Sequence, residues 1–486
     1  MRYLIKNGYI AVSDSEAAFI EADLLIEGEV IARIGNHKEF KDIHDVECID
    51  ASGCLILPGF INSHIHSHDH FNRGQFDNKP LELWMPLLRP FFTGISANKD
   101  EIYLRTLLGC IEMLKTGTTM IIDDIVQTPF DDEEKLDAIY RAYKKAGIRA
   151  FFTTHIGNKP IEKTIPFLEE AFDMTGFSYK SDFNFDENEI LGYVESMLKK
   201  YSNDQEAVQR YAVAPSGPQR CSTELIQGLT ALAKDYAVPA VIHTLETYSQ
   251  KIAGDHFFDK SLISHLDDID ALNPYVNLIH CVWVTENDIQ IMKRKGVRVV
   301  HNPTSNLKLG SGIAPVKAML DANIPVGLGT DNTSSNDSIN MFSEMKMAAL
   351  INKGTNADYR KWVGAEEAFY MATLGGAKCA NLDDQIGSID VGKKADLSVV
   401  SIENERFAPL NNLLNHVVFA ENGSSVRDVF VNGQCVVRNG SIVTFSESEV
   451  ISEVKKLLPK IKEEQKLAVT EAEEILKSLE LAYSKA

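Results

Sequence analysis

Eight short apolar segments that alternate with helical patterns constrain the fold of this chain more than any other feature. Near-continuous apolar strands separated by helices are typical of a parallel sheet that is buried on both faces. In chain order the segments read LILPGFINSHIH, TMIIDDI, RAFFTTH, RYAVAPS, AVIHTLE, VNLIHCV, VRVVHNP and PVGLGTD. Eight of them predict an α/β fold, a TIM-type (β/α)8 barrel over residues 55–375.

Side chains that can bind a metal gather at the ends of these segments. A His, Asp or Glu stands at or near the end of most of them, and the C-terminal strand ends of such a barrel carry its chemistry. The residues are His64, His66, Asp123, Asp124, His155, His243, Glu246, His280, His301 and Asp331. The pattern therefore predicts an active site at this end of the barrel.

The first of these segments runs into the stretch NSHIHSHDH, in which four histidines are spaced two residues apart. Side chains two apart in a strand point the same way. His64 and His66 still belong to the predicted strand, so both face the site. His68 and His70 lie beyond it, where the chain turns into the first loop. They either face the substrate, support the site from behind, are ordinary polar loop residues or, as the least favoured alternative, bind the metal.

Three neutral nitrogens and one carboxylate suit a catalytic Zn²⁺ or Fe²⁺ and leave a position for water. His64 and His66 supply the first pair of ligands. On the fifth and eighth predicted strands, His243 and Asp331 are the candidates that complete the set.

The two ends of the chain resemble each other more than they resemble the middle. Residues 1–54 and 376–445 both read as short strands joined by glycine-centred turns. We expect them to form one composite β-sandwich beside the barrel. Residues 446–486 are charged and helical, and Pro459 predicts a break there. This tail is interpreted as a surface helix pair or an oligomer contact. The segment between the third and fourth strands, roughly 156–209, either covers the active site or is a surface insertion.

Composition narrows the class of partner. The chain has 486 residues and a formal net charge of −20, from 69 acidic and 49 basic residues, without a basic run. This disfavours nucleic acid as a partner. No apolar stretch is long enough to span a membrane, and the N-terminus lacks the apolar core of a signal peptide. Seven scattered cysteines without a CxxC motif fit reduced thiols. We therefore expect a cytoplasmic protein.

Seven motifs, in order, give the chain a wider resemblance. They are PGFINSHIH, VIHTLE, LIHCVWVTENDI, HNPTSNLKLGSGIAP, GLGTDNTSSND, GSIDVGKKADL and VRDVFVNGQCVV. From about residue 1 to 445 the chain resembles the amidohydrolase superfamily, and most of all its chlorohydrolase and aminohydrolase branch, with its adenosine-type, guanine and triazine deaminases. The resemblance implies one divalent metal, Zn²⁺ or Fe²⁺, bound by His64, His66, His243 and Asp331. The fourth strand, RYAVAPSGPQRCS, has no lysine to bridge two metals, which favours a mononuclear site.

The same resemblance implies a mechanism. Glu246 follows His243 in an HxxE arrangement and would deliver protons to a ring nitrogen and to the leaving amine. His280 would orient and deprotonate water, and Asp331 would be both ligand and proton relay. The implied activity is hydrolytic deamination of an amino-substituted nitrogen heterocycle through a metal-bound hydroxide. Hydrolysis of a C–N amide or C–Cl bond at the same site is the alternative, and a catalytically silent scaffold is a third interpretation.

Substrate contacts are assigned to Trp84, His155, Ser216 and His301, with Arg73, Gly74 and Asn306 matching patterns of the branch. One departure bears on the substrate. Relatives that act on adenosine-type nucleosides usually have a histidine in an APHAP segment, where this chain reads Ala214-Pro215-Ser216-Gly217-Pro218. This departure leaves a free base, a pterin or a triazine-like ring as alternatives to a nucleoside. We expect a small heterocyclic molecule as the substrate. The sequence leaves open whether the chain forms a homo-oligomer.

Overall fold

The fold was analysed in a computed structural model that describes all residues except 1, 13–18, 91–92, 94–96, 128 and 179–185. Each of the eight predicted segments contains a strand. The strands are β6 (Phe60–Ile65), β7 (Thr118–Ile125), β8 (Arg149–Ile156), β9 (Gln209–Tyr211) with β10 (Ala214–Pro215), β11 (Ala240–Thr244), β12 (Val276–His280), β13 (Arg298–His301) and β14 (Val326–Leu328).

These strands form two parallel sheets that meet at both edges. One sheet has the order β10-β8-β7-β6 with β9 paired to β8, and the other has the order β11-β12-β13-β14. Single parallel bridges join the sheets, between Val213 and Ala240 at one seam and between Ile65 and Asp331 at the other. Eight parallel strand positions therefore follow one another around a ring, which is the arrangement of a (β/α)8 barrel.

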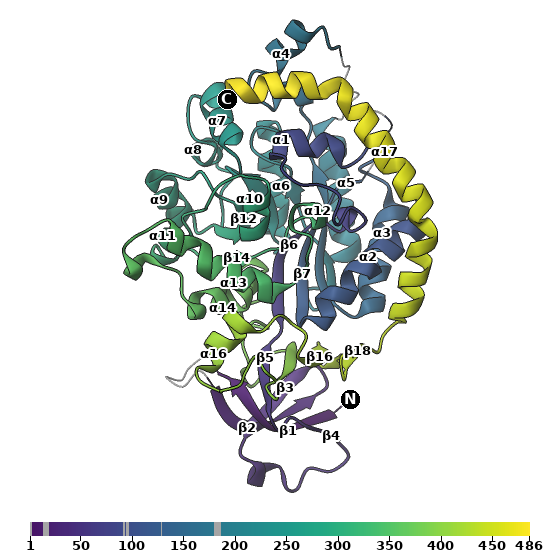
Figure 1. The fold of residues 1–486 in the computed structure, drawn as a ribbon, viewed down its shortest axis with the longest axis vertical. Helices are drawn as coiled ribbons and strands as arrows, with labels where there is room; N and C mark the ends of the chain where they lie inside the picture. The colour runs from purple at the N-terminus through teal and green to yellow at the C-terminus, as the bar shows by residue number, and fades with distance from the viewer. Residues whose placement is uncertain (1, 13–18, 91–92, 94–96, 128, 179–185) are drawn as a thin grey trace.

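Helices follow the strands and cover the outside of the ring (Figure 1). In α3, Leu136, Ile139 and Tyr143 recur on one face and are fully buried, Asp132 caps the first turn, and Gly147 ends the helix at φ 77°. The helices are α1 (Leu81–Trp84), α2 (Lys99–Lys115), α3 (Glu133–Ala146), α4 (Leu168–Thr175), α5 (Glu187–Tyr201), α6 (Thr223–Asp235), α7 (Tyr248–Phe258), α8 (Leu262–Asp268), α9 (Glu286–Lys295), α10 (Pro303–Lys308), α11 (Val316–Asp321), α12 (Thr333–Asn336), α13 (Met341–Ile351), α14 (Ala365–Ala372), α15 (Leu374–Cys379), α16 (Leu413–Asn415) and α17 (Glu447–Lys485).

Both ends of the chain contribute strands to one nine-stranded sheet at the bottom of Figure 1. Its order is β18-β17-β16-β15-β5-β1-β2-β3, with β4 paired to β1. The strands are β1 (Arg2–Ala11), β2 (Phe19–Glu27), β3 (Val30–Gly35), β4 (Glu47–Asp50), β5 (Cys54–Pro58), β15 (Leu397–Ser401), β16 (Val426–Val431), β17 (Gln434–Arg438) and β18 (Ser441–Ile442).

The boundaries between sheet and barrel differ from those predicted. Residues 54–58 pair with β1 and β15 and belong to the sheet, so the first boundary lies at Gly59 and not at residue 55. The apolar run LILPGF hides this break. Gly59 is required there, because a Cβ atom would lie 2.1 Å from Thr119 Oγ1. At the second boundary, α15 packs against β14, β13 and β6, so the barrel continues to Cys379 instead of ending at residue 375.

The predicted break at Pro459 is wrong, because residues 447–485 form one helix, α17. Proline removes one N–H and strains the preceding turn. Pro459 and Lys455, whose carbonyl loses its partner, are both exposed, so water replaces the lost hydrogen bond. Further along, Ile475 and Leu479 are fully buried against α4. This packing offsets the local cost of the proline.

The long segment between β8 and β9 provides part of the surface against which α17 packs. Its helix α4 packs on the C-terminal part of α17 through Leu168 and Phe172.

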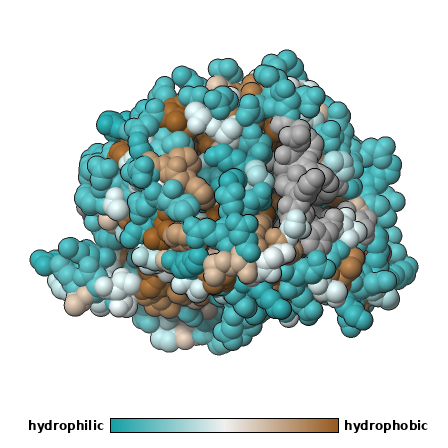
Figure 2. All heavy atoms as spheres, turned by 90° about the horizontal axis from the view of Figure 1, so that it is seen from above, coloured by the Kyte–Doolittle hydropathy of each residue, from teal (hydrophilic) through white to brown (hydrophobic). Residues whose placement is uncertain are grey.

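Figure 2 shows the molecule from above the view of Figure 1. On this face, hydrophobic side chains are scattered among hydrophilic ones. Within the described part of the chain, no helix combines the length and the apolar character needed to cross a membrane.

Candidate metal centre

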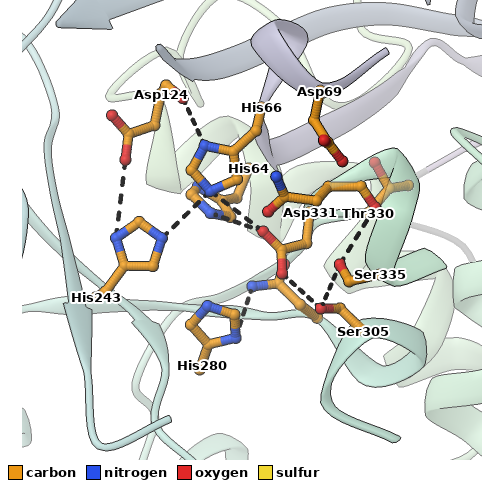
Figure 3. Close-up of polar contacts among 12 residues, drawn as sticks. His64, His66, Asp69, Asp124, His243, His280, Ser305, Thr330, Asp331 and Ser335 are labelled. Carbon is orange, nitrogen blue, oxygen red and sulfur yellow. Dashed lines mark hydrogen bonds and ion pairs between the residues drawn. The ribbon is translucent and has the colours of Figure 1, made fainter. Parts of the chain in front are cut away.

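Four predicted ligands come together at the C-terminal ends of three strands (Figure 3). His64 and His66 lie at the end of β6, His243 lies on β11, and Asp331 follows β14. The Oδ1 atom of Asp331 lies 3.4 Å from His64 Nε2 and 3.3 Å from His66 Nε2. The Nε2 atoms of His243 and His66 are 3.4 Å apart. All four side chains are at least nine-tenths buried.

These three spacings fit neighbouring ligands of one cation. Ligand bonds of about 2.0–2.2 Å from nitrogen or oxygen to zinc place tetrahedral ligand atoms roughly 3.3–3.6 Å apart. The observed separations of 3.3–3.4 Å fall within that range. The ring nitrogens of His64 and the Oδ1 atom of Asp331 are buried and have no hydrogen-bond partner among the residues that the structure describes. A divalent ion would satisfy these atoms, so the donor set fits a metal.

Electrostatics at the cluster also favour a cation. Burial alone would lower the pKa of His66, but its contacts with Asp331 and Asp124 raise it to about 9. Burial lowers the pKa of His64 to about 4, and that of His243 falls well below its usual value for the same reason. Burial would raise the pKa of Asp331, yet the neighbouring histidines hold it well below its usual range. One carboxylate is thus ionised among histidines of which two are neutral.

Asp124 contacts two of the predicted ligands from behind, a position that the sequence did not assign to it. Its backbone carbonyl lies 2.5 Å from His66 Nδ1, and its Oδ2 atom lies 3.7 Å from His243 Nδ1. Ser305 donates to Asp331 Oδ2 at 2.5 Å. Such partners fix the ring orientation and raise the basicity of a ligand. Asp124 follows Asp123 on β7, and the adjacent pair at a strand end was the available signal.

Glu246 and His280 face each other beside the four ligands. The Oε2 atom of Glu246 lies 3.6 Å from His280 Nε2. Burial raises the pKa of Glu246 to about 7, which suits an acid–base group at neutral pH. The other ring nitrogen, His280 Nδ1, lies 2.9 Å from Asn306 Oδ1 and 3.3 Å from Asn302 Nδ2, and these two amides hold the ring in place. The backbone of His280 has φ 73°, a conformation that residues other than glycine rarely adopt.

The strand-like alternation ends after His66, because residues 67–69 form a 3-10 turn. His68 Nδ1 accepts the N–H of Val126 at 3.2 Å, and its ring lies 5.1 Å from that of His66. His70 turns away from the centre and lies against α2, with Nδ1 3.2 Å from the carbonyl of Arg105. Neither residue belongs to the four-ligand cluster.

The predicted substrate residues lie at different depths around the centre. His155 is bound to Asp124, with Nδ1 2.7 Å from Oδ2. Both ring nitrogens of His301 are buried and have no hydrogen-bond partner among the described residues. Ser216 stands at the rim, where its N–H donates to the carbonyl of Ile156. Trp84 packs with Leu81 and Leu309 in a small apolar cluster of the first loop.

Comparison with known proteins places these features in a wider group. Residues 55–436 match the family model described as amidohydrolase family. A 5-methylthioadenosine/S-adenosylhomocysteine deaminase of Syntrophus aciditrophicus is 32% identical over 95% of this chain and 98% of its own length. A 5'-deoxyadenosine deaminase of Methanococcus vannielii is 34% identical over 91% and 97%. The crystal structure of an adenosine deaminase from Xanthomonas campestris with bound zinc has a TM-score of 0.81 at 24% identity, over 95% of this chain and 98% of that one.

Proposed function

The chain belongs to the amidohydrolase family, and on that premise we propose that it is a metal-dependent hydrolase that removes an amino group from a nitrogen heterocycle. The observation that carries the proposal is the group of four buried side chains, in which three donor-atom separations are 3.3–3.4 Å, beside the facing pair Glu246 and His280. Enzymes that hydrolyse C–N bonds in this way need an activated water and a proton carrier next to it.

We propose that His64, His66, His243 and Asp331 hold one divalent ion, with zinc the expected metal. Nitrogen and carboxylate donors suit zinc, which would lower the pKa of a bound water molecule to about 7. Asp124, His155 and His243 also lie close enough together to hold a metal. His155 Nδ1 and Asp124 Oδ2 already form a contact with each other at 2.7 Å, which supports one metal and not two.

The chain's own groups then divide the proton transfers. His280, whose Nε2 faces Glu246, is the group proposed to orient water and to take its proton. Glu246 is the expected acid, because a carboxyl with a pKa of about 7 is partly protonated at neutral pH and can deliver a proton to a ring nitrogen and then to the leaving amine. Asp331 stays ionised and serves as ligand and hydrogen-bond acceptor.

The relatives named above act on adenosine derivatives that differ at the 5' position, which supports an adenosine-type ring as the substrate. Ser216, where a histidine is usual in such enzymes, supports a free base, a pterin or a triazine instead. His155, His301, Trp84 and Ser216 remain the proposed substrate contacts. The alternative reaction, hydrolysis of a C–N amide or C–Cl bond, would use the same groups.

A substrate screen separates these possibilities. Zinc-loaded protein is incubated with 5'-methylthioadenosine, S-adenosylhomocysteine, 5'-deoxyadenosine, guanine, pterin, an aminotriazine and a chlorotriazine. Release of ammonia from one of the amino compounds is the expected result, and Glu246→Gln protein is the matched control. Release of chloride or of a carboxylic acid without ammonia would instead support the alternative reaction.

We also propose a cytoplasmic location, because all seven cysteines are unpaired and five of them are buried. A homo-oligomer stays a prediction, which light scattering of the purified protein would test.

A further inference from the structure

Arg220 lies at the rim of the barrel, in the turn that leads from β10 into α6. Its N–H donates to the carbonyl of Gly217 at 3.0 Å, and its own carbonyl accepts the N–H groups of Asn158 and Lys159 at 3.2 Å each. Gly217 stands so close to β11 that a Cβ atom there would lie 3.1 Å from the carbonyl oxygen of His243. The backbone of Arg220 is thus held in place next to a proposed metal ligand.

The guanidinium group of Arg220 has few partners for a largely buried cation. It can donate five hydrogen bonds. The described contacts are one to Ser216 Oγ and one to Met85 Sδ, each at 3.5 Å, and thioether sulfur is a weak acceptor. Within the described part of the chain, no carboxylate oxygen lies within 4.0 Å of its nitrogens. Burying a cation without a direct counterion is costly.

The charges around Arg220 place it on the side of the proposed acid. Burial lowers the pKa of Arg220, and the carboxylates of Glu246 and Glu82 counteract this from a distance. A second guanidinium, that of Arg89, lies within electrostatic range: burial and the charge of Arg220 lower the pKa of Arg89 to about 10, and the carboxylate of Asp69 counteracts them. Among the described residues Arg220 therefore has no direct carboxylate partner, and it is free to bind one negative charge of a substrate.

We propose that Arg220, with Ser216 beside it, is a specificity residue that binds a carboxylate substituent of the heterocyclic substrate. The proposal rests on the proposed function, since the ring must lie at the metal centre for the substituent to reach the rim. A carboxylate matches the planar fork of a guanidinium, which can donate two parallel hydrogen bonds to it. One arginine offsets a single negative charge, which favours a carboxylate over a doubly charged phosphate.

A structural role for the same residue makes a different prediction. If Arg220 only offset the charges of Glu82 and Glu246, its loss would change the turnover of charged and neutral substrates alike. A carboxylate-binding role affects only the charged member of a matched pair, and it affects binding more than turnover. Paired ligands that differ only in this charge therefore separate the two roles.

The test uses two such pairs with zinc-loaded protein. They are adenosine-5'-carboxylate with adenosine-5'-carboxamide, and pterin-6-carboxylate with pterin-6-carboxamide. Calorimetry gives the Kd of each compound, and ammonia release gives kcat and KM. Arg220→Gln removes the charge, and Arg220→Lys keeps the charge but loses the fork. Lys159→Gln is the matched control, because it removes a neighbouring cation whose amino group lies over the Phe258 ring, away from the metal ligands.

We expect the native protein to bind the carboxylate of at least one pair ten- to a hundredfold more tightly than its carboxamide. Arg220→Gln should remove this preference and leave the carboxamide Kd within about threefold, Arg220→Lys should keep part of it, and Lys159→Gln should keep it all. The proposal is overturned if the native protein shows no tenfold preference in either pair, or if Arg220→Gln weakens both members equally. If the native protein prefers a carboxylate but releases no ammonia, the proposed function is contradicted and the Arg220 site is retained.

Discussion

The carboxylate of Glu246 faces the ring of His280, with 3.6 Å between Oε2 and Nε2, and both side chains are almost fully buried. Neither residue belongs to the four-ligand cluster. In the proposed site, the two groups would move protons without giving up a bond to the metal. The first prediction depends on this separation of proton transfer from metal binding.

Glu246→Gln should keep the metal and lose the activity. The amide has the size of the carboxyl group but cannot exchange a proton, so turnover should fall about 100-fold or more. Zinc content should stay at the native level, because Glu246 is not a ligand. The variant is assayed for zinc and for ammonia release on the best substrate of the screen. Near-native turnover would show that Glu246 is not the acid.

The four histidines of residues 64–70 should fall into three groups when each is replaced by alanine. His64→Ala and His66→Ala should lose zinc and turnover together, because each removes a ligand. His68→Ala should keep zinc and change only the affinity for substrate. His70→Ala should keep zinc but lower the free energy of unfolding by about 2 kcal/mol, because the ring fills the space beside Gly109.

Metal analysis and thermal unfolding of the four variants test this division into three groups. Loss of zinc from His68→Ala or His70→Ala as complete as that from His64→Ala would show that the ligand assignment is wrong.

Zinc binding by the metal-free protein should strengthen as the pH rises. His66 has a pKa of about 9 without the metal and must lose its proton before the nitrogen can bind. The proton is present below that value, so the apparent affinity should increase up to about tenfold for each pH unit between 7 and 9. Competition with a chromophoric chelator at three pH values measures this. An affinity that stays constant over the range would contradict the charge state derived for His66.

Glu344 offers a prediction on stability outside the ligand cluster. Its carboxyl accepts a hydrogen bond from Asn336 at 2.8 Å, and burial raises its pKa from 4.5 to about 7. The unfolded chain therefore releases this proton at a lower pH than the folded one, so stability falls as the pH rises from about 4.5 to 7. The loss is on the order of 3 kcal/mol.

Glu344→Gln should remove this pH dependence, since the amide does not ionise. The variant should unfold less easily than the native protein at pH 8, and the difference should vanish near pH 4.5. Denaturant unfolding of both proteins at four pH values gives the comparison. A difference that is the same at every pH would show that Glu344 is already ionised in the fold.

The sequence was sufficient for the barrel and for the grouping of the four predicted ligands at one end of it, because both depend on local pattern. Buried parallel strands are apolar throughout, and residues two apart on a strand share a face, which selects His64 and His66. Asp123 and Asp124 show the limit of this reasoning. They point to opposite faces of β7, and only the fold reveals that Asp123 accepts from Tyr143 while Asp124 supports the ligands.

Other features depended on packing that no local pattern reports. Pro459 predicts a break, but exposure of its turn and the burial of Ile475 keep α17 continuous. The boundary at Gly59 lies inside one apolar run, because strands of both domains are equally buried there. The role proposed for Arg220 rests on the contacts of its guanidinium group with Ser216 and Met85, and Met85 is distant from it in the chain.

The most direct test of the metal-dependent hydrolase is a titration of stripped protein with zinc, in which bound zinc and ammonia release are measured on the same samples. Four ligands at one centre predict that both rise together and reach a plateau at one zinc per chain. A plateau at two zinc ions per chain, or ammonia release from protein without metal, would contradict the account.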